Sequence, residues 1–152
     1  MRIERSFNAD DIHSILRHPE IYPLISHDGA PSAEEFIVNP EQQIFALGYV
    51  EDVPVGCVIL HPRTALCWQV HFQVLPEYRK QYALSMGQEG LEWAWENTTA
   101  IKLVAEVPQI YSNVTAFALK QGFQIEGTNR KSTVINGEII DSLLLGISKW
   151  DL

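Results

Sequence analysis

The segment Val74-Leu75-Pro76-Glu77-Tyr78-Arg79-Lys80-Gln81-Tyr82-Ala83-Leu84 joins a strand-like stretch to a helical one. Over residues 66–74, apolar side chains alternate with polar ones, which is the period of a half-buried strand. Pro76 closes that strand and suits the first turn of a helix, which we predict from about residue 77 to residue 97. The start of such a helix carries unpaired N–H groups and therefore favours an anion.

Before this junction, the sequence predicts a short strand, two helices and a run of three strands. Asn8 is a suitable N-cap for the first helix. Residues 20–31 are expected to form a loop or a broken helix. Ser32 and Glu35 stand in a capping-box pattern, so a second, short helix is predicted over residues 33–38. The strands are predicted at residues 3–7, 44–50, 55–60 and 66–74.

After the junction, the sequence predicts a strand, a helix and a hairpin. Ser112 or Asn113 is expected to cap the helix and Gly122 to end it. Asn136-Gly137 is a strong hairpin signal between two further strands. The order predicts an α/β (α+β) fold in a single domain, residues 1–152, with a mixed, mostly antiparallel central sheet of about seven strands and helices on both faces. The three strands are predicted at residues 101–107, 123–131 and 139–147.

The composition is that of an ordinary globular protein. The 152 residues include 46% hydrophobic and 20% charged residues, and the net charge is −8. This charge argues against a nucleic-acid partner, and no apolar run is long enough to predict a membrane span. Cys57 and Cys67 lie in apolar segments, where reduced thiols are expected, and a cytoplasmic location is the default. The histidines show no metal-ligand spacing, so no metal is predicted.

Several separate motifs resemble the GNAT (GCN5-related N-acetyltransferase) superfamily, and together they span nearly the whole chain. The first is Val74-Leu75-Pro76-Glu77-Tyr78-Arg79. The more specific one is Ala118-Leu119-Lys120-Gln121-Gly122-Phe123-Gln124-Ile125-Glu126-Gly127, followed by Arg130-Lys131, Asn136-Gly137 and Asp141. The chain is most similar to the branch that contains ribosomal-protein acetyltransferases and their bacterial and phage relatives.

The resemblance implies an acetyl-CoA site at the opening junction. In the family, the pantetheine arm inserts beside the fourth strand and bonds its exposed backbone groups, and the pyrophosphate lies on the next helix start. A contact from the next helix is implied for Asn113, which stands near the position of a family Asn. The implied cofactor-binding residues are Phe72, Val74, Leu75, Arg79, Lys80, Gln81, Tyr82, Ala83, Leu84 and Asn113.

The family pattern for the pyrophosphate is Arg or Gln, two residues, Gly, one residue, then Gly or Ala. Arg79 matches it, but Tyr82 and Leu84 occupy the two small-residue positions, and Lys80 replaces another common glycine. A Cβ there obstructs close backbone approach to phosphate oxygens. One interpretation is that Lys80 compensates electrostatically and acetyl-CoA is retained. The other is that a plain helix starts at Pro76, with Leu84 in the core, and the cofactor is lost.

The resemblance also implies where the catalytic groups stand. A base is expected on or near the fourth strand, where His71 is the one side chain that titrates near neutral pH. A structural role for this lone histidine is the alternative. The family's acid, a Tyr that protonates the thiolate, corresponds to Ala118. Tyr111 is then the candidate acid, with a packing or surface role as its alternative.

Two functions follow from these residues. The first is an N-acetyltransferase that moves acetyl from acetyl-CoA to an amine of a small molecule or protein. The second is a catalytically degenerate GNAT-like domain with a binding or structural role, for example in a bacteriophage particle. Of the neighbouring tryptophans, Trp93 is expected in the core and Trp95 at an interface, which would suit a homodimer.

Overall fold

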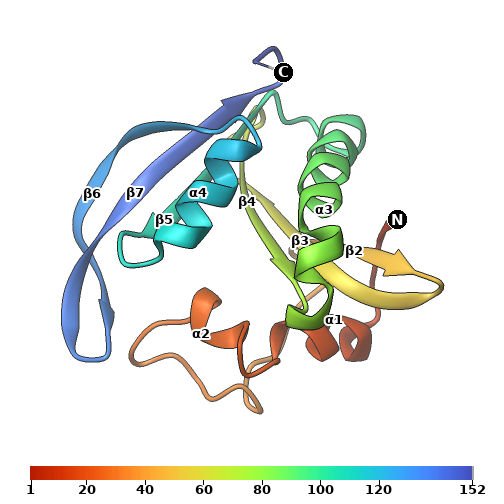
Figure 1. Cartoon of the computed structure of the whole chain (residues 1–152), viewed down its shortest axis with the longest axis horizontal. Coiled ribbons are helices and arrows are strands. Elements are labelled where there is room, and N and C mark those ends of the chain that lie inside the picture. The colour runs from red at the N-terminus through yellow and green to blue at the C-terminus, as the bar shows by residue number, and fades with distance from the viewer. Residues whose placement is uncertain (152) are drawn as a thin grey trace.

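A computed structural model describes residues 1–151, and its central feature is one sheet of seven strands in the order β1-β2-β3-β4-β5-β7-β6 (Figure 1). Neighbouring strands are antiparallel except for β4 and β5, which are parallel. The predicted mixed, mostly antiparallel sheet is therefore confirmed. The strands are β1 (Arg2–Arg5), β2 (Ile44–Val50), β3 (Val53–Pro62), β4 (Cys67–Val74), β5 (Lys102–Pro108), β6 (Gln124–Ile135) and β7 (Glu138–Ser148).

Four helices accompany the sheet: α1 (Ala9–Leu16), α2 (Tyr22–Ile25), α3 (Pro76–Asn97) and α4 (Ser112–Lys120). A core cluster joins the α3 and α4 side to one face of the sheet, with Met86, Leu91 and Ala118 among its helical members. A second cluster joins α1 to the other face, through Ile12 and Ile15 among others. Figure 1 shows α3 and α4 on either side of β4, with α1 and α2 near one end of the sheet.

Helix α3 packs closely on the sheet because it carries glycine at the contact. A Cβ built on Gly90 would lie 2.8 Å from a ring atom of Phe72 and 2.9 Å from a methyl group of Val58. Real Cβ atoms do not approach other atoms this closely, so any side chain here would push the helix away from β3 and β4. Glycine therefore sets the distance between α3 and the strand that leads into it.

The predicted caps and turns are confirmed at three places. The side chain of Asn8 accepts a hydrogen bond from the Asp11 N–H (3.2 Å) at the start of α1. Asn136 and Gly137 have φ of 52° and 78°, which suits the tight turn between β6 and β7. Gly122, with φ of 103°, follows α4, where a left-handed residue commonly ends a helix.

Other local predictions are wrong. Residues 33–38 form no helix. Residues 33–35 make one turn that begins at Ser32, because Pro31 and Pro40 leave too short a segment to propagate a helix. At α4, Tyr111 occupies the N-cap position in place of Ser112 or Asn113, and it makes no side-chain cap hydrogen bond. In α3, Leu84 is not a core residue, because 55% of it is exposed.

The tryptophan prediction is also reversed by the structure. Trp95 is only 8% exposed and belongs to the core, whereas Trp93 is half-buried and packs against that core from outside. The two residues are two positions apart in α3 and therefore project about 200° apart around the helix axis, so only one of them can face the sheet. Trp95 is therefore not available for the interface that was expected of it.

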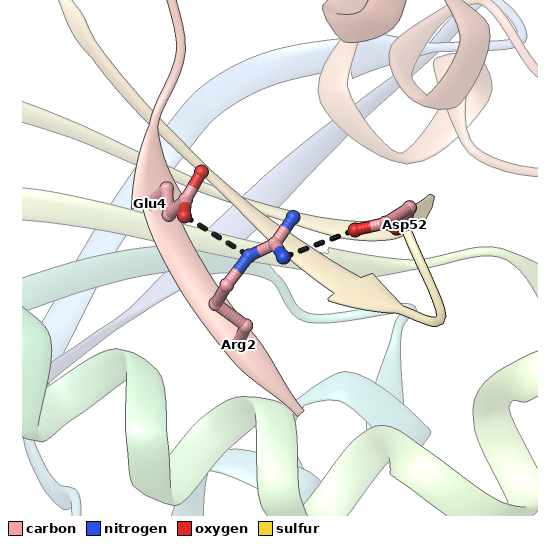
Figure 2. Close-up of polar contacts among 3 residues, drawn as sticks. All are labelled: Arg2, Glu4 and Asp52. Carbon is pink, nitrogen blue, oxygen red and sulfur yellow. Dashed lines mark hydrogen bonds and ion pairs between the residues drawn. The ribbon is translucent and has the colours of Figure 1, made fainter.

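The edge strand β1 is tied to the β2–β3 turn by one arginine (Figure 2). Arg2 contacts Glu4 at 3.0 Å and Asp52 at 3.1 Å, and its guanidinium lies 4.8 Å from the centre of the Tyr49 ring. The turn residues Glu51 and Asp52 have φ of 49° and 67°. All these charges are well exposed, so the ion pairs contribute little stability and mainly orient the turn.

Candidate functional site

Strands β4 and β5 form a fork at the centre of the sheet. They pair only over Cys67–Gln69 of β4, after which no pairing joins them. On the other side, β4 remains paired with β3 as far as Val74. Because hydrogen-bonding directions alternate along a strand and the Leu75 N–H points to Val55 O (2.9 Å), the backbone groups of Phe72 and Val74 point into the fork.

The fork opens into a cavity of ≈ 530 Å³. Its walls come from the end of β4, the first half of α3 and the start of α4, and Glu20 and Leu24 contribute from the α1–α2 region. Apolar side chains make up most of the lining, with a few polar groups among them, as in small-molecule sites generally. The predicted site residues among its walls are Phe72, Val74, Arg79, Ala83, Tyr111 and Asn113.

Helix α3 begins at Pro76, immediately after the N-cap Leu75, and is regular from there to Asn97. In a regular helix, the N–H groups of Gln81, Tyr82 and Ala83 bond carbonyls four residues earlier. Of the first-turn positions, Pro76 has no N–H, and the Tyr78 N–H donates to Leu75 O at 2.9 Å. The predicted pyrophosphate segment is thus part of a helix whose amides are already paired.

Two predicted backbone contacts are taken by the protein itself. The Leu75 N–H donates to Val55 O and the Leu75 carbonyl accepts from Tyr78, so the prediction that Leu75 offers free groups to a cofactor is wrong. The Arg79 side chain donates through Nε to Val74 O at 3.0 Å. Phe72 and the N–H of Val74 are the β4 groups that remain to receive a ligand in the fork.

The other residues of the predicted pyrophosphate segment lie away from the main cavity. Tyr82 faces a separate hollow beside Met1, and its ring lies 6.2 Å from that of Tyr78, centre to centre. Lys80, Gln81 and Leu84 are exposed and line none of the three hollows described for this structure. The structure therefore brings only Arg79 and Ala83 of this segment to the cavity.

A smaller cavity of ≈ 70 Å³ adjoins the larger one at the fork, and the two share Phe72 and Tyr111 in their walls. It is lined by the predicted base His71, by Ala118 at the family's tyrosine position, and by Glu106 and Gln121, which were not predicted. The smaller cavity therefore gathers the titratable groups at the inner end of the site.

His71 has an environment that keeps it neutral. Burial, followed by the charge of the nearby His61, lowers the pKa of His71 to about 4. Its Nε2 lies 3.3 Å from the Gln69 amide nitrogen. At pH 7 the imidazole is free to accept a proton, but with this pKa it holds that proton weakly. His71 and Tyr111 do share the smaller cavity, as the sequence-based assignment requires.

Glu106 is a carboxylate that the sequence reasoning missed. It lies on β5 across the fork from His71, and its Oε1 accepts a hydrogen bond from Asn129 Nδ2 at 2.9 Å. The signal in the sequence was a lone acidic residue between Ala105 and Val107 inside an apolar strand. A charged residue in such a position has to be paired or functional, because burial of an isolated charge is costly.

Residues 22–31, which we call the roof segment, close the site on the α1 side. Leu24 lines both cavities, and the Tyr111 hydroxyl donates to Pro23 O at 3.4 Å. At the far end, the Asp28 carboxylate accepts from the N–H groups of Asn136 (2.9 Å) and Gly137 (2.7 Å). The roof segment therefore spans from α4 to the tip of the β6–β7 hairpin.

Within residues 1–151, no three His, Cys, Asp or Glu side chains gather in a way that could hold a metal ion. Among the helices of that same part of the chain, none has the length and apolar character needed to cross a bilayer.

Comparison with solved structures identifies the fold. The chain matches a ribosomal-protein-alanine N-acetyltransferase from Brucella melitensis with a TM-score of 0.73 at 17% identity, over 97% of this chain and 99% of that one. For a spermidine N-acetyltransferase from Vibrio cholerae, in complex with CoA and spermine, the TM-score is 0.79 at 16% identity, over 97% and 95%.

An acetyltransferase of the GNAT family from Streptococcus pneumoniae matches with a TM-score of 0.70 at 16% identity, over 97% of this chain and 99% of that one. No protein-family model and no curated protein matches the sequence. The structural likenesses confirm the predicted GNAT fold.

Proposed function

We propose that this protein is an N-acetyltransferase that transfers acetyl from acetyl-CoA to an amine of a small molecule or protein. The observation that carries the proposal is the β4–β5 fork, which leaves the backbone groups of Phe72 and the N–H of Val74 unpaired beside a cavity of ≈ 530 Å³. An extended pantetheine arm can pair with such a strand as a peptide would. Acetyl-CoA would supply the activated acetyl group as a thioester.

The residues at the inner end of the fork fit an amine acceptor. An amine must lose its proton before it attacks a thioester carbonyl, and Glu106 is a carboxylate placed to take that proton directly or through a water. Phe72 would hold the thioester through its backbone, and Tyr111 would close the site beside it. Positioning of this kind supplies much of the acceleration in transfer reactions.

The acceptor class is a further part of the proposal. The structural neighbours include enzymes named for spermidine and for a ribosomal-protein alanine, which are both amines. In this chain Glu20 and Glu106 line the two cavities, and the net charge of −8 favours a cationic acceptor by long-range attraction. The protein would work as one domain in the cytoplasm.

A second candidate function is a GNAT-like domain that has lost acetyl-CoA and binds a partner, such as a component of a bacteriophage particle. Two observations favour it. Helix α3 starts at Pro76, so the N–H groups that a pyrophosphate would need are already bonded within the helix. In addition, the Arg79 side chain donates a hydrogen bond to the Val74 carbonyl oxygen. These features weaken phosphate binding but leave the fork open.

A titration with acetyl-CoA separates the two functions. A ligand that binds only the folded protein raises its unfolding temperature, and at a concentration of 100 times the Kd it contributes about 2.7 kcal/mol. We expect a saturating shift, matched by a saturable heat in calorimetry. The absence of both at millimolar acetyl-CoA would overturn the acetyltransferase and leave the partner-binding domain.

A matched pair of variants locates the binding. Ala83→Trp places a large side chain in the wall of the main cavity, whereas Gln88→Trp changes an exposed position on the same helix outside the cavity. Ala83→Trp should abolish the acetyl-CoA shift and Gln88→Trp should retain it. Equal binding by both variants would place the ligand elsewhere.

A further inference from the structure

Gln121 is a buried polar side chain with an unmet hydrogen-bonding capacity. It follows the last turn of α4, is only 6% exposed, and lines the smaller cavity. Its Nε2 has no hydrogen-bond partner among residues 1–151. Native proteins rarely leave a buried amide donor unpaired, because the group has lost its water without a replacement.

The side-chain amide of Gln121 packs against a glycine on the neighbouring helix. A Cβ built on Gly87 of α3 would lie 2.5, 2.7 and 2.8 Å from the amide carbon, nitrogen and oxygen of Gln121. A residue without a side chain leaves this space, so the contact between α3 and α4 accommodates the amide. The amide is thus packed against α3, while its nitrogen has no hydrogen-bond partner among the described residues.

The surroundings of Gln121 indicate what its partner could be. Residues Ala118 and Gln121 are three apart, and they lie close together on the cavity side of the helix end. Ala118 contributes only a methyl group where the family pattern has a tyrosine hydroxyl, so Ala118 itself supplies no polar group to the cavity. Across the cavity, β4 offers backbone groups of Phe72. A group in the cavity therefore meets a strand on one side and Gln121 on the other.

We infer that Gln121 donates a hydrogen bond to the sulfur of the bound acyl-CoA thioester and of the thiolate that leaves. The inference rests on the proposed function, which brings the thioester to this end of the fork. The strand side provides backbone N–H donors for the carbonyl oxygen, so the sulfur faces α4. Nε2 is then the unpaired donor nearest to the growing negative charge.

The step balances without another reactant. The amine nitrogen forms a bond to the carbonyl carbon, its proton passes to Glu106 or to water, and the C–S bond breaks with its electron pair going to sulfur. Gln121 keeps its protons and stabilises the thiolate by a charge-assisted hydrogen bond. The thiolate later takes a proton from solvent, because an ordinary thiol has a pKa of about 8.5.

The pKa of the thiol in bound CoA tests the contact without catalysis. It is measured from the ultraviolet absorbance of the thiolate in complexes of wild type, Gln121→Met and the control Gln88→Met, whose side chain is exposed on α3. Loss of one charge-assisted hydrogen bond should raise this pKa in Gln121→Met by about one unit. The control should match wild type.

The possible results distinguish a failure of this inference from a failure of the proposed function. Failure of all three proteins to bind CoA would overturn the proposed function and the inference with it. Binding by all three with the same thiol pKa would overturn the inference alone. A higher thiol pKa in Gln121→Met, with an unfolding temperature no lower than that of wild type, would support the inference, since a merely structural role would lower that temperature.

A kinetic measurement gives a second readout. On an amine found to be acetylated, Gln121→Met should lower kcat by about 10- to 100-fold with little change in the KM for acetyl-CoA. The loss should shrink for acetyl thioesters of more acidic thiols, which need less help to leave. Gly87→Ala keeps Gln121 but displaces its amide, and it should lower kcat in the same direction. Equal losses for all thioesters would contradict the sulfur contact.

Discussion

Glu106 and His71 lie on the two arms of the β4–β5 fork and line the same small cavity. Burial lowers the pKa of His71 to about 4, so it can keep a proton only weakly. Asn129 orients the Glu106 carboxylate beside the fork, where its negative charge would attract a cationic amine as the neutral His71 cannot. At the scale of single residues, this attraction makes the carboxylate the stronger candidate for the base, although the sequence pointed to the histidine.

Substitution of the two residues should therefore give unequal results. Glu106→Gln keeps the shape and removes the base, and kcat/KM on an identified amine should fall by about 10²- to 10⁴-fold. His71→Gln should cost less than tenfold. Steady-state kinetics checks both, with the exposed Glu138→Gln as a control. A larger loss in His71→Gln than in Glu106→Gln would restore the histidine as the base.

The lowered pKa of His71 also predicts how stability depends on pH. In the unfolded chain His71 titrates near 6.5, whereas in the folded protein it stays neutral down to about 4. Between these values the unfolded state binds more protons, so the free energy of unfolding falls as the pH decreases, by at most about 3 kcal/mol from this group.

His71→Leu should remove this part of the pH dependence. Urea unfolding of wild type and variant at pH 7, 6, 5 and 4 measures it, and the free energy of unfolding should fall more steeply for wild type than for the variant as the pH decreases. The exposed His27→Leu serves as a control. Parallel curves for wild type and His71→Leu would show that the histidine is not held neutral by the fold.

At the scale of elements, helix α3 decides how well the site can hold a pyrophosphate. It begins at Pro76 and runs unbroken through Lys80, Tyr82 and Leu84, all of which are compatible with a helix. Glycines at these positions would favour an open turn in place of the helix. The side chains therefore act through the backbone. They favour the helix, in which the backbone N–H groups bond carbonyl oxygens and cannot donate to an anion.

Restoring glycine should open this turn. The double variant Tyr82→Gly with Leu84→Gly should lose about 2 kcal/mol of unfolding free energy, since each glycine in a helix costs about 1 kcal/mol. In exchange its Kd for CoA should fall by about tenfold, because freed amides can bond phosphate oxygens. Calorimetry measures the affinity. Gln88→Gly has a similar helix cost and should leave the Kd unchanged; an unchanged Kd in the double variant would contradict this account.

The order of elements was predictable because each depends on local signals. Alternating residues in β4, the Asn8 cap and the Asn136-Gly137 turn act within a few residues, and all three appear in the structure. The helix predicted over residues 33–38 was wrong because a capping box starts a helix only where the chain can continue one. Leu84 was expected in the core if a plain helix starts at Pro76; the helix does start there, but its start does not tell which positions lie against the sheet.

The site was less predictable, because its residues meet only through the fold. Glu106 and Gln121 come from β5 and the end of α4, and no local motif relates them to His71. Leu75 was expected to offer its backbone to a cofactor, but that depends on which neighbour pairs with it, here Val55. Strand pairing and helix contacts of this kind are long-range properties of the sequence.

At the scale of the whole molecule, the roof segment joins parts of the chain that are far apart in sequence. The Asp28 carboxylate accepts hydrogen bonds from two N–H groups of the hairpin tip. The backbone N–H of Asp28 donates to Val134 O at 3.0 Å. Charge-assisted bonds of this kind are among the stronger ones in proteins. The roof over both cavities is therefore held by the β6–β7 hairpin.

Removal of the Asp28 carboxylate should loosen the roof. Asp28→Ala leaves the amides of Asn136 and Gly137 without their acceptor, so hydrogen exchange at both should accelerate by about tenfold or more, and the unfolding free energy should fall by about 1–2 kcal/mol. Exchange followed by NMR measures the effect. Glu138→Ala, exposed on the same hairpin, should leave the exchange rates unchanged, and equal rates in Asp28→Ala and wild type would contradict the contact.

The contact between Asp28 and the hairpin tip also fixes a sequence of events in folding. Asn136 and Gly137 follow Asp28 by 108 and 109 residues, so the contact closes a loop that includes most of the residues of the structure. A ribosome releases the chain from its N-terminus, so Asp28 emerges more than a hundred residues before its partners Asn136 and Gly137. Helices α1 and α2 and most of the sheet can form earlier. The roof becomes fixed only after the hairpin tip has been synthesised, so the cavities take their final shape later than these elements.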